Sequence, residues 1–273
     1  MFSIFNQMYW CRKIISGMLE CFMSKNKLQK NRAFLKDSLR LTIDFSNTDQ
    51  NRGIEPPPMQ KPFSKDQELI PLPGKNEWTS IEKIDLLHAI SNRRSRRAYQ
   101  QTALKPDELA FLLWSTQGID EMIGQNHAYR TVPSAGCRHA FETYLAVMKI
   151  DSLNPGVYRY LPIEHSLLLE NGDDHLAYKL IDATLGQSFV GMSAVVFIWT
   201  VIPYRMEWRY DAAAHRVIAV DAGHVCQNLY LACESIKSGT CAIAAYHQDK
   251  MDRLIGVDGE DEFTIYLAPV GKV

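Results

Sequence analysis

The sequence predicts an α+β fold, and three long apolar segments carry that prediction. Residues 141–150 and 194–202 are nearly continuous runs of aliphatic, β-branched and aromatic side chains, as in buried strands. Residues 212–236 instead repeat apolar side chains at helical spacing, which predicts one long buried helix. Strands and helices follow one another without the regular alternation of a doubly wound sheet, and no repeat of solenoid period is present.

The composition is that of a globular protein with one large domain or two small ones. The chain has 273 residues, of which 46% are hydrophobic, so it can bury a substantial core. Its 30 basic and 31 acidic residues give a net charge of -1. This balance excludes the overall basic charge that is typical of nucleic-acid-binding proteins. We therefore expect neither nucleic acid nor a membrane surface as a partner.

The cysteines and the apolar runs favour a cytoplasmic location. No CxxC pair or regular framework is present, so we expect reduced, unpaired thiols at Cys11, Cys21, Cys137, Cys226, Cys233 and Cys241. No apolar run reaches the roughly 18 residues needed to cross a bilayer, because Glu20 interrupts the run at residues 14–23. Arg12 and Lys13 resemble the start of a signal peptide, but no small-residue cleavage site follows them.

Residues 1–75 predict an N-terminal arm, and residues 76–273 predict the domain that follows it. The arm lacks sustained periodicity and contains a basic stretch at residues 25–40, followed by prolines at residues 56–73. Scattered apolar residues between Phe34 and Phe45 predict a short helix that docks on a surface, with the proline-rich part running extended. A disordered tail is the alternative for the first 25 residues.

From Thr79 onward, local signals predict a series of ordered elements. Thr79 and Glu82 form a capping-box pattern that opens a helix ending near Asn92, and Pro106 opens a second helix that Gly118 stops. In the first helix, four apolar residues are predicted to face inward: Ile81, Ile84, Leu87 and Ile90. The remaining predicted elements are a polar loop at residues 119–132, strands at 157–160, 167–169 and 263–270, and a helix at 173–183.

The pentapeptide Arg93-Arg94-Ser95-Arg96-Arg97 places four guanidinium groups and one hydroxyl just after the first helix. In an extended backbone, side chains alternate, so Arg93, Ser95 and Arg97 share one face while Arg94 and Arg96 point to the other. The first face offers two forked donors and a hydroxyl to a phosphate or another delocalised anion. The alternative interpretation of the pentapeptide is a solvated basic turn.

Several motifs of catalysis are absent from the sequence. No GxGxxG follows a predicted strand, and neither GxxxxGK[ST] nor HExxH occurs, which excludes a dinucleotide fold, a P-loop and a zincin site. Ser134 and His139 are a conceivable nucleophile and base of a hydrolase, but five positions apart on a loop they have no fixed geometry. The eight histidines show no spacing for metal ligands, so we name neither a metal site nor a catalytic side chain.

Three short elements occur in a fixed order: the arginine pentapeptide, the loop Pro133-Ser134-Ala135-Gly136 and the segment Ile243-Ala244-Ala245-Tyr246. Together they resemble the FMN-dependent nitroreductase family, in particular its SagB-type branch. The resemblance extends from about Asn31 to the C-terminus, with an arm at residues 32–50. Further matching positions are residues 130–132, 141–144, 156–160, His165, Leu167, 208–210, 221–229, Thr240 and Cys241.

In fold, the resemblance implies a nitroreductase-like domain, with a central mixed or antiparallel sheet flanked by helices, in a domain-swapped homodimer. FMN would bind at the dimer interface, and the N-terminal arm would exchange with the partner. NAD(P)H and the oxidant would take turns on one face of the flavin, so that no separate nucleotide site is needed. The implied activity is hydride transfer through flavin N5 to a nitro, quinone or related conjugated small molecule.

The resemblance also assigns cofactor-binding roles. Arg93, Arg94 and Ser95 would hold the phosphate and ribityl end of FMN. Arg97 would lie at the pyrimidine edge, where a cation stabilises the negative charge of the reduced ring. The remaining implied contacts are Pro133, Ser134, Ala135 and Gly136 over the ring from the second subunit, Ile243, Ala244 and Ala245 near N5, and Lys272 in place of a basic C-terminal segment.

Two other functions remain open at this point. One is an azoline dehydrogenase that acts on a modified peptide, although that chemistry needs a base and no Lys–Tyr pair is placed for it. The other is a non-catalytic module that binds flavin or nucleic acid through the arginine pentapeptide and the basic arm. The sequence departs from the family pattern at Cys137, Ala140 and residues 211–215, near the predicted pocket.

Overall fold

The structure is a computed structural model that describes residues 27–124 and 126–273. The chain divides into two compact units, Met1–Asp44 and Phe45–Val273. In the described part of the first unit, residues 27–34 form a helix and Asp37–Thr42 form a 3-10 helix, η1. The predictions for Cys11, Cys21 and residues 14–23 fall outside the described residues.

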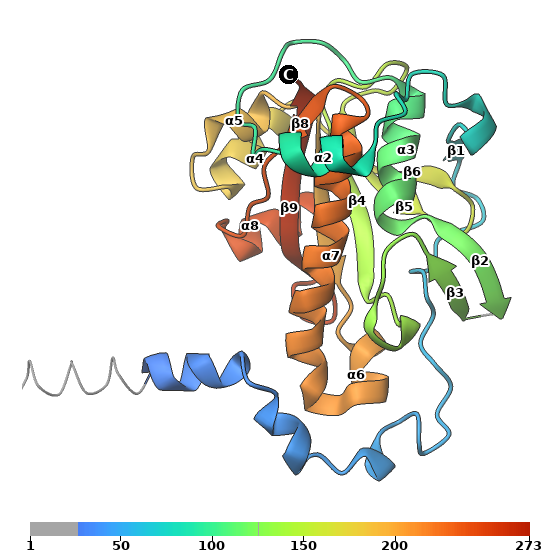
Figure 1. Cartoon of the computed structure of the whole chain (residues 1–273), viewed down its shortest axis with the longest axis vertical. Helices are drawn as coiled ribbons and strands as arrows, with labels where there is room; N and C mark the ends of the chain where they lie inside the picture. Colours follow the sequence, from blue (N-terminus) through green and yellow to red (C-terminus); the bar gives the residue numbers. More distant parts are fainter. Residues whose placement is uncertain (1–26, 125) are drawn as a thin grey trace, which may run out of the picture. The chain divides into compact units, whose positions relative to one another are not determined.

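A seven-stranded sheet forms the centre of the second unit (Figure 1), in the order β1-β6-β5-β4-β7-β9-β8. All of its neighbouring strands pair antiparallel. Its strands are β1 (Leu69–Pro71), β4 (Phe141–Val147), β5 (Gly156–Leu161), β6 (Ser166–Gly172), β7 (Val195–Val201), β8 (Ser238–Thr240) and β9 (Phe263–Lys272). The central strands β4 and β7 are buried at every residue, which confirms the two strands predicted from continuous apolar runs.

Helices cover both faces of this sheet, because side chains of the central strands alternate between two cores. From β4, Phe141 and Leu145 join a core with α3 and α7, whereas Tyr144 and Ala146 join a core with α4 and α8. Figure 1 shows α7 lying along the sheet. The helices are α2 (Leu86–Asn92), α3 (Pro106–Gln117), α4 (Leu176–Ala183), α5 (Ser188–Gly191), α6 (Tyr204–Tyr210), α7 (Ala214–Glu234) and α8 (Gln248–Ile255). The predicted α+β class is confirmed.

The predicted helix from Thr79 to Asn92 is wrong in its first half. Helix α2 begins only at Leu86, and Asp85 caps it by accepting a hydrogen bond from the His88 N–H at 2.7 Å. The Thr79 N–H instead donates to the Asp107 carboxylate at 3.0 Å, so this backbone serves a contact with α3. Leu87 and Ile90, predicted to face inward, are 76% and 56% exposed.

The predicted polar loop at residues 119–132 is also wrong. It forms a two-stranded antiparallel hairpin of β2 (Ile119–Gly124) and β3 (His127–Arg130). The hairpin is separate from the main sheet and its first strand is largely exposed, so no apolar alternation marks it in the sequence.

Residues 59–62, here called the strap, are tied to the sheet although they lie in the stretch that the sequence predicts as an arm. The Lys61 N–H donates to Glu142 Oε1 at 2.7 Å, and Arg159 Nη1 donates to the Lys61 carbonyl oxygen at 2.9 Å. The Lys61 ammonium also forms an ion pair with Glu262 at 2.5 Å. Together with β1, the strap makes this proline-rich stretch an integral part of the second unit.

In the described part of the chain, no helix is long and apolar enough to cross a membrane. The same residues contain no group of three or more His, Cys, Asp and Glu side chains that is placed to hold a metal ion. The thiols of Cys137, Cys226, Cys233 and Cys241 are all free, as predicted.

Candidate functional site

The arginine segment, residues 93–97, leaves the end of α2 and joins the edge of the main sheet. Ser95 forms an isolated parallel bridge with Thr240 of β8, and the Arg96 N–H donates to the Thr240 carbonyl oxygen at 2.9 Å. The Tyr99 hydroxyl donates to the Arg96 carbonyl oxygen at 2.8 Å. These bonds fix the backbone of the segment, while most of its side chains remain exposed to solvent.

The positive charge of the arginine segment is not compensated. Among the residues that the structure describes, none of its four guanidinium groups forms an ion pair with a carboxylate. Arg94 Nη1 donates to two backbone carbonyl oxygens, of Ser91 at 2.9 Å and of Arg93 at 2.8 Å. The Arg93 guanidinium lies 5.3 Å from the centroid of the Tyr230 ring. Forked donors without a carboxylate partner suit a phosphate-sized anion.

Tyr230 of α7 connects this segment to the alanine segment, residues 243–245. Its hydroxyl lies 3.0 Å from Ser95 Oγ and accepts a hydrogen bond from the Ala242 N–H at 2.9 Å. The structure therefore brings the predicted phosphate-binding residues and the predicted N5-contacting residues close together. Neither resemblance nor spacing relates residue 230 to residue 95 in the sequence, so sequence reasoning missed this link.

The alanine segment presents backbone donors rather than side chains. Ile243 is buried, and its N–H and carbonyl oxygen both bond to Leu267 of β9, at 2.8 and 3.2 Å. Ala244 and Ala245 are exposed, and within the described chain their N–H groups have no acceptor. The Gln187 amide donates to the Ala245 carbonyl oxygen at 3.0 Å, which steadies the end of the segment.

The remaining arginine of the segment points toward the same helix as Gln187. The Arg97 guanidinium lies 5.9 Å from the centroid of the Phe189 ring in α5. Two contacts, Gln187 with Ala245 and Phe189 with Arg97, therefore place α5 beside both segments. Neither contact is recognisable from the sequence, because the four positions share no motif.

The loop of residues 133–136, here called the Pro133 loop, is anchored elsewhere on α7. Asp221 accepts hydrogen bonds from the Ser134 hydroxyl at 2.6 Å and from the Ala135 N–H at 3.1 Å. Burial raises the pKa of Asp221, and the bonds from Ser134 and Ala135 partly offset that rise. Gly136 has a φ of 59°, and a Cβ there would lie 2.5 Å from the Tyr210 hydroxyl, so only glycine fits.

The Pro133 loop and the arginine segment lie apart within one chain. Asp221 holds the loop and Tyr230 holds the segment, and these residues are nine positions apart on one helix. At 1.5 Å rise and 3.6 residues per turn, nine positions correspond to about 14 Å and about two and a half turns. The two anchors therefore point to opposite sides of α7.

Ser134 and His139 do not form a nucleophile and base pair. The Ser134 hydroxyl donates to Asp221 and accepts from the backbone N–H of His139 at 3.0 Å, so the imidazole is not its partner. His139 Nε2 instead lies 3.6 Å from Cys137 Sγ. Burial, with Arg130 and Arg138 nearby, lowers the pKa of His139 to about 3. The hydrolase interpretation is not supported by this geometry.

The lowered pKa of His139 predicts a loss of stability in mild acid. Below pH 6.5 the unfolded chain binds a proton that the folded chain binds only near pH 3, so stability falls as the pH falls through that window. From pH 7 to pH 5 this group should reduce the free energy of unfolding by about 2 kcal/mol. Urea unfolding at both pH values should show a smaller loss in His139→Asn than in the wild type. An equal loss in both proteins would contradict the assignment.

Lys272 is engaged inside the fold. Its ammonium group pairs with Glu108 at 2.5 Å and donates to the Ile236 carbonyl oxygen at 2.6 Å. The side chain is 16% exposed, and the Glu108 side chain is 5% exposed. Because this charge already has a buried partner, we leave Lys272 out of the phosphate site proposed below.

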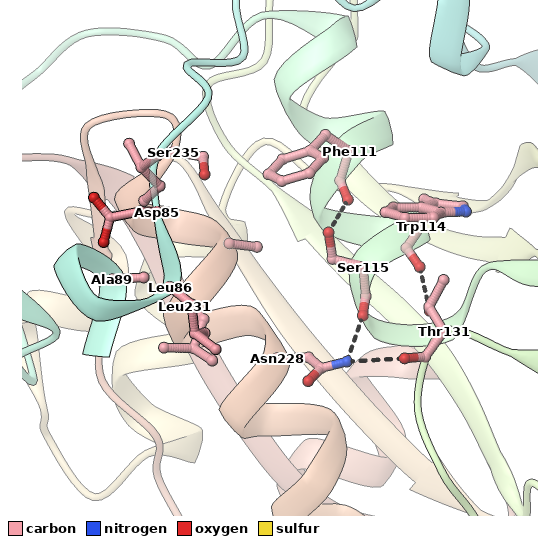
Figure 2. A pocket seen from close by; sticks show the side chains of 12 residues that line it. Asp85, Leu86, Ala89, Phe111, Trp114, Ser115, Thr131, Asn228, Leu231 and Ser235 are labelled. Atoms are coloured by element: carbon pink, nitrogen blue, oxygen red, sulfur yellow. Dashed lines mark hydrogen bonds between the residues drawn. The ribbon is translucent and has the colours of Figure 1, made fainter.

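A groove of about 370 Å³ lies between α2, α3 and α7 (Figure 2). Leu86 and Ala89 of α2 line one side, and Phe111 and Trp114 of α3 line the other. At its base, the Asn228 amide donates to the carbonyl oxygens of Ser115 and Thr131 at 2.9 and 3.3 Å. The groove continues onto an apolar surface of α2, where Leu86, Leu87 and Ile90 are 67%, 76% and 56% exposed.

The arrangement of these segments can be compared with known proteins. A model of the nitroreductase family matches residues 90–272, about two thirds of the chain. The chain belongs to the nitroreductase family. This is a family of oxidoreductases, so the protein is an enzyme of that class.

Individual nitroreductase-family relatives agree with this assignment. A putative nitroreductase of Methanocaldococcus jannaschii is 30% identical over 192 residues, which cover 70% of this chain and 93% of that protein. The crystal structure of a putative nitroreductase from Ralstonia eutropha superposes with a TM-score of 0.62 at 26% identity, covering 80% of this chain and 94% of that one. The trifolitoxin operon protein TfxC of Rhizobium leguminosarum is 24% identical over 68% of this chain and 55% of its own length.

Proposed function

We propose that the protein is an FMN-dependent NAD(P)H oxidoreductase of the SagB-type branch, which reduces a nitro, quinone or related conjugated small molecule. The observation that carries the proposal is the junction at Tyr230. There, a guanidinium cluster without carboxylate partners lies beside two exposed backbone N–H groups that lack an acceptor among the described residues. An anion-binding cluster next to free main-chain donors is a donor set that suits a flavin mononucleotide.

The chain's own residues would divide the binding of FMN between them. Arg93, Arg94 and Ser95 would donate to the phosphate and the ribityl end. The backbone N–H of Ala244 or Ala245 would donate to N5 of the ring. Bound FMN would supply hydride transfer at N5, and the protein would contribute binding and orientation of the ring.

Arg97 would tune the cofactor rather than anchor it. A guanidinium at the pyrimidine edge favours the reduced, more negative form of the ring, and so raises the reduction potential. We expect Arg97→Ala to lower the potential of the bound flavin by about 30 mV, which corresponds to about 1.4 kcal/mol for a two-electron couple. Spectroelectrochemical titration measures the shift, with Arg97→Lys as the charge-retaining control. An unchanged potential in Arg97→Ala would refute the role.

The complete site would be formed by two copies of the chain. The Pro133 loop is anchored at Asp221, on the opposite side of α7 from Tyr230, which supports its contributing to the flavin of a partner copy. The apolar surface of α2 beside the groove is of the kind that a homodimer covers. Sedimentation equilibrium tests the dimer, and a monomer at micromolar concentration would contradict it.

The decisive experiment is to purify the protein and identify the chromophore. We expect yellow protein that releases FMN on denaturation and oxidises NADH or NADPH in the presence of a quinone or nitroaromatic acceptor. A colourless protein that cannot be reconstituted with FMN would overturn the proposal. Binding of nucleic acid that weakens steeply with salt would instead support the non-catalytic module.

The match to the trifolitoxin operon protein keeps a second candidate in view, an azoline dehydrogenase that acts on a modified peptide. Such a reaction needs a base that removes a ring proton while the flavin takes the hydride. Oxidation of a thiazoline-containing peptide by the FMN-loaded protein, without turnover of quinones, would favour this candidate over the first.

A further inference from the structure

The Tyr230 hydroxyl lies between a fixed donor and a serine that the proposed function assigns to phosphate. On one side, it accepts from the Ala242 N–H at 2.9 Å; on the other, it lies 3.0 Å from Ser95 Oγ. We propose that Tyr230 is a positioning residue that orients the Ser95 hydroxyl as a hydrogen-bond donor to the phosphate of FMN. This inference rests on the proposed function and adds a residue that acts through Ser95.

The direction of the hydrogen bonds follows from the chemistry of the three groups. The Ala242 N–H can only donate, so it occupies a lone pair of the Tyr230 oxygen. The phenol is more acidic than a serine hydroxyl and is the better donor of the two. Tyr230 therefore donates to Ser95 Oγ, and the Ser95 hydroxyl hydrogen turns toward the solvent side of the segment. A negatively charged group placed there receives a hydrogen bond whose donor is already oriented.

The Tyr230 ring contributes a second restraint on the same site. The Arg93 guanidinium lies 5.3 Å from the ring centroid, a distance at which a cation is attracted to an aromatic face. Tyr230 belongs to α7, which packs against both α2 and β8. A rigid helix thus sets the position of one charged donor and one hydroxyl donor, so less freedom is lost when an anion binds.

Comparison of FMN with riboflavin isolates the phosphate, since riboflavin lacks only that group. Apoprotein would be titrated with each flavin and followed by quenching of flavin fluorescence. We expect Tyr230→Phe, which keeps the ring beside Arg93, to raise the dissociation constant for FMN about tenfold and to leave that for riboflavin unchanged. Ser95→Ala should behave alike, and Tyr230→Phe should add little in the Ser95→Ala background, because both changes remove the same donor.

Tyr178→Phe is the matched control, since Tyr178 is 76% exposed on α4, where no role is assigned to it. Equal weakening of FMN and riboflavin by Tyr230→Phe, or additive effects with Ser95→Ala, would overturn the inference while leaving the proposed function intact. A wild-type protein that binds neither flavin would overturn both. Thermal unfolding of each apoprotein checks that the substitutions leave the fold unchanged.

Discussion

Glu142→Gln is expected to lower the free energy of unfolding by about 3–5 kcal/mol. Glu142 Oε1 accepts from Arg205 Nη2 at 2.5 Å, and both side chains are 2% exposed. The same oxygen accepts from the Lys61 N–H of the strap at 2.7 Å. Glutamine removes the negative charge, so the Arg205 guanidinium remains buried without compensation. Guanidinium chloride unfolding followed by circular dichroism measures the loss.

Two comparisons separate the buried charge from a general loss of contacts. The double variant Glu142→Leu with Arg205→Met removes both charges, and it should be more stable than Glu142→Gln. Asp182→Asn breaks the exposed pair with Lys250, whose side chains are 53% and 40% exposed, and it should change stability by less than about 1 kcal/mol. A double variant as unstable as Glu142→Gln would contradict the electrostatic explanation.

Arg93→Ala is expected to weaken the binding of FMN by about tenfold to a hundredfold, because a charge-assisted hydrogen bond to phosphate is lost. Its effect on riboflavin should be small. Arg96→Ala is the matched control within the same segment. The Arg96 Cβ and Cγ pack against Gly239 on the backbone of β8, and its guanidinium group is assigned no contact with the cofactor.

Both arginine variants remove one positive charge from the same surface, so a nonspecific electrostatic effect would weaken FMN equally in each. Titration of both apoproteins with FMN at fixed ionic strength distinguishes the two explanations. Equal dissociation constants for Arg93→Ala and Arg96→Ala would contradict a specific phosphate contact.

Elements that bury continuous apolar sequence were predictable, and elements defined by tertiary contacts were not. Strands β4 and β7 and helix α7 announce themselves by composition and periodicity, because burial on all sides demands apolar side chains throughout. The start of α2 was missed because Thr79 uses its backbone for Asp107, a contact that no local pattern encodes. The β2–β3 hairpin was missed because its first strand carries mixed side chains and is mostly exposed.

The same distinction applies to the candidate site. The arginine segment could be recognised because its charge is concentrated in five consecutive residues, and the alanine segment because its small residues follow a family pattern. Asp221 and Tyr230 could not be assigned these contacts, because each acts through the geometry of a long helix on a partner far away in sequence. The proposed roles of the predicted residues themselves stay predictions until a flavin complex is measured.

The strap also constrains the order in which the chain can fold. Lys61 contacts residues 81 and 201 positions later in the sequence, Glu142 and Glu262. During synthesis it is made early, yet its ammonium group finds its carboxylate only when almost the entire polypeptide has emerged. Closure of such distant contacts is slow, so the strap should be among the last parts to lock into place. Until then, a nascent chain keeps the edge of its central sheet unsealed.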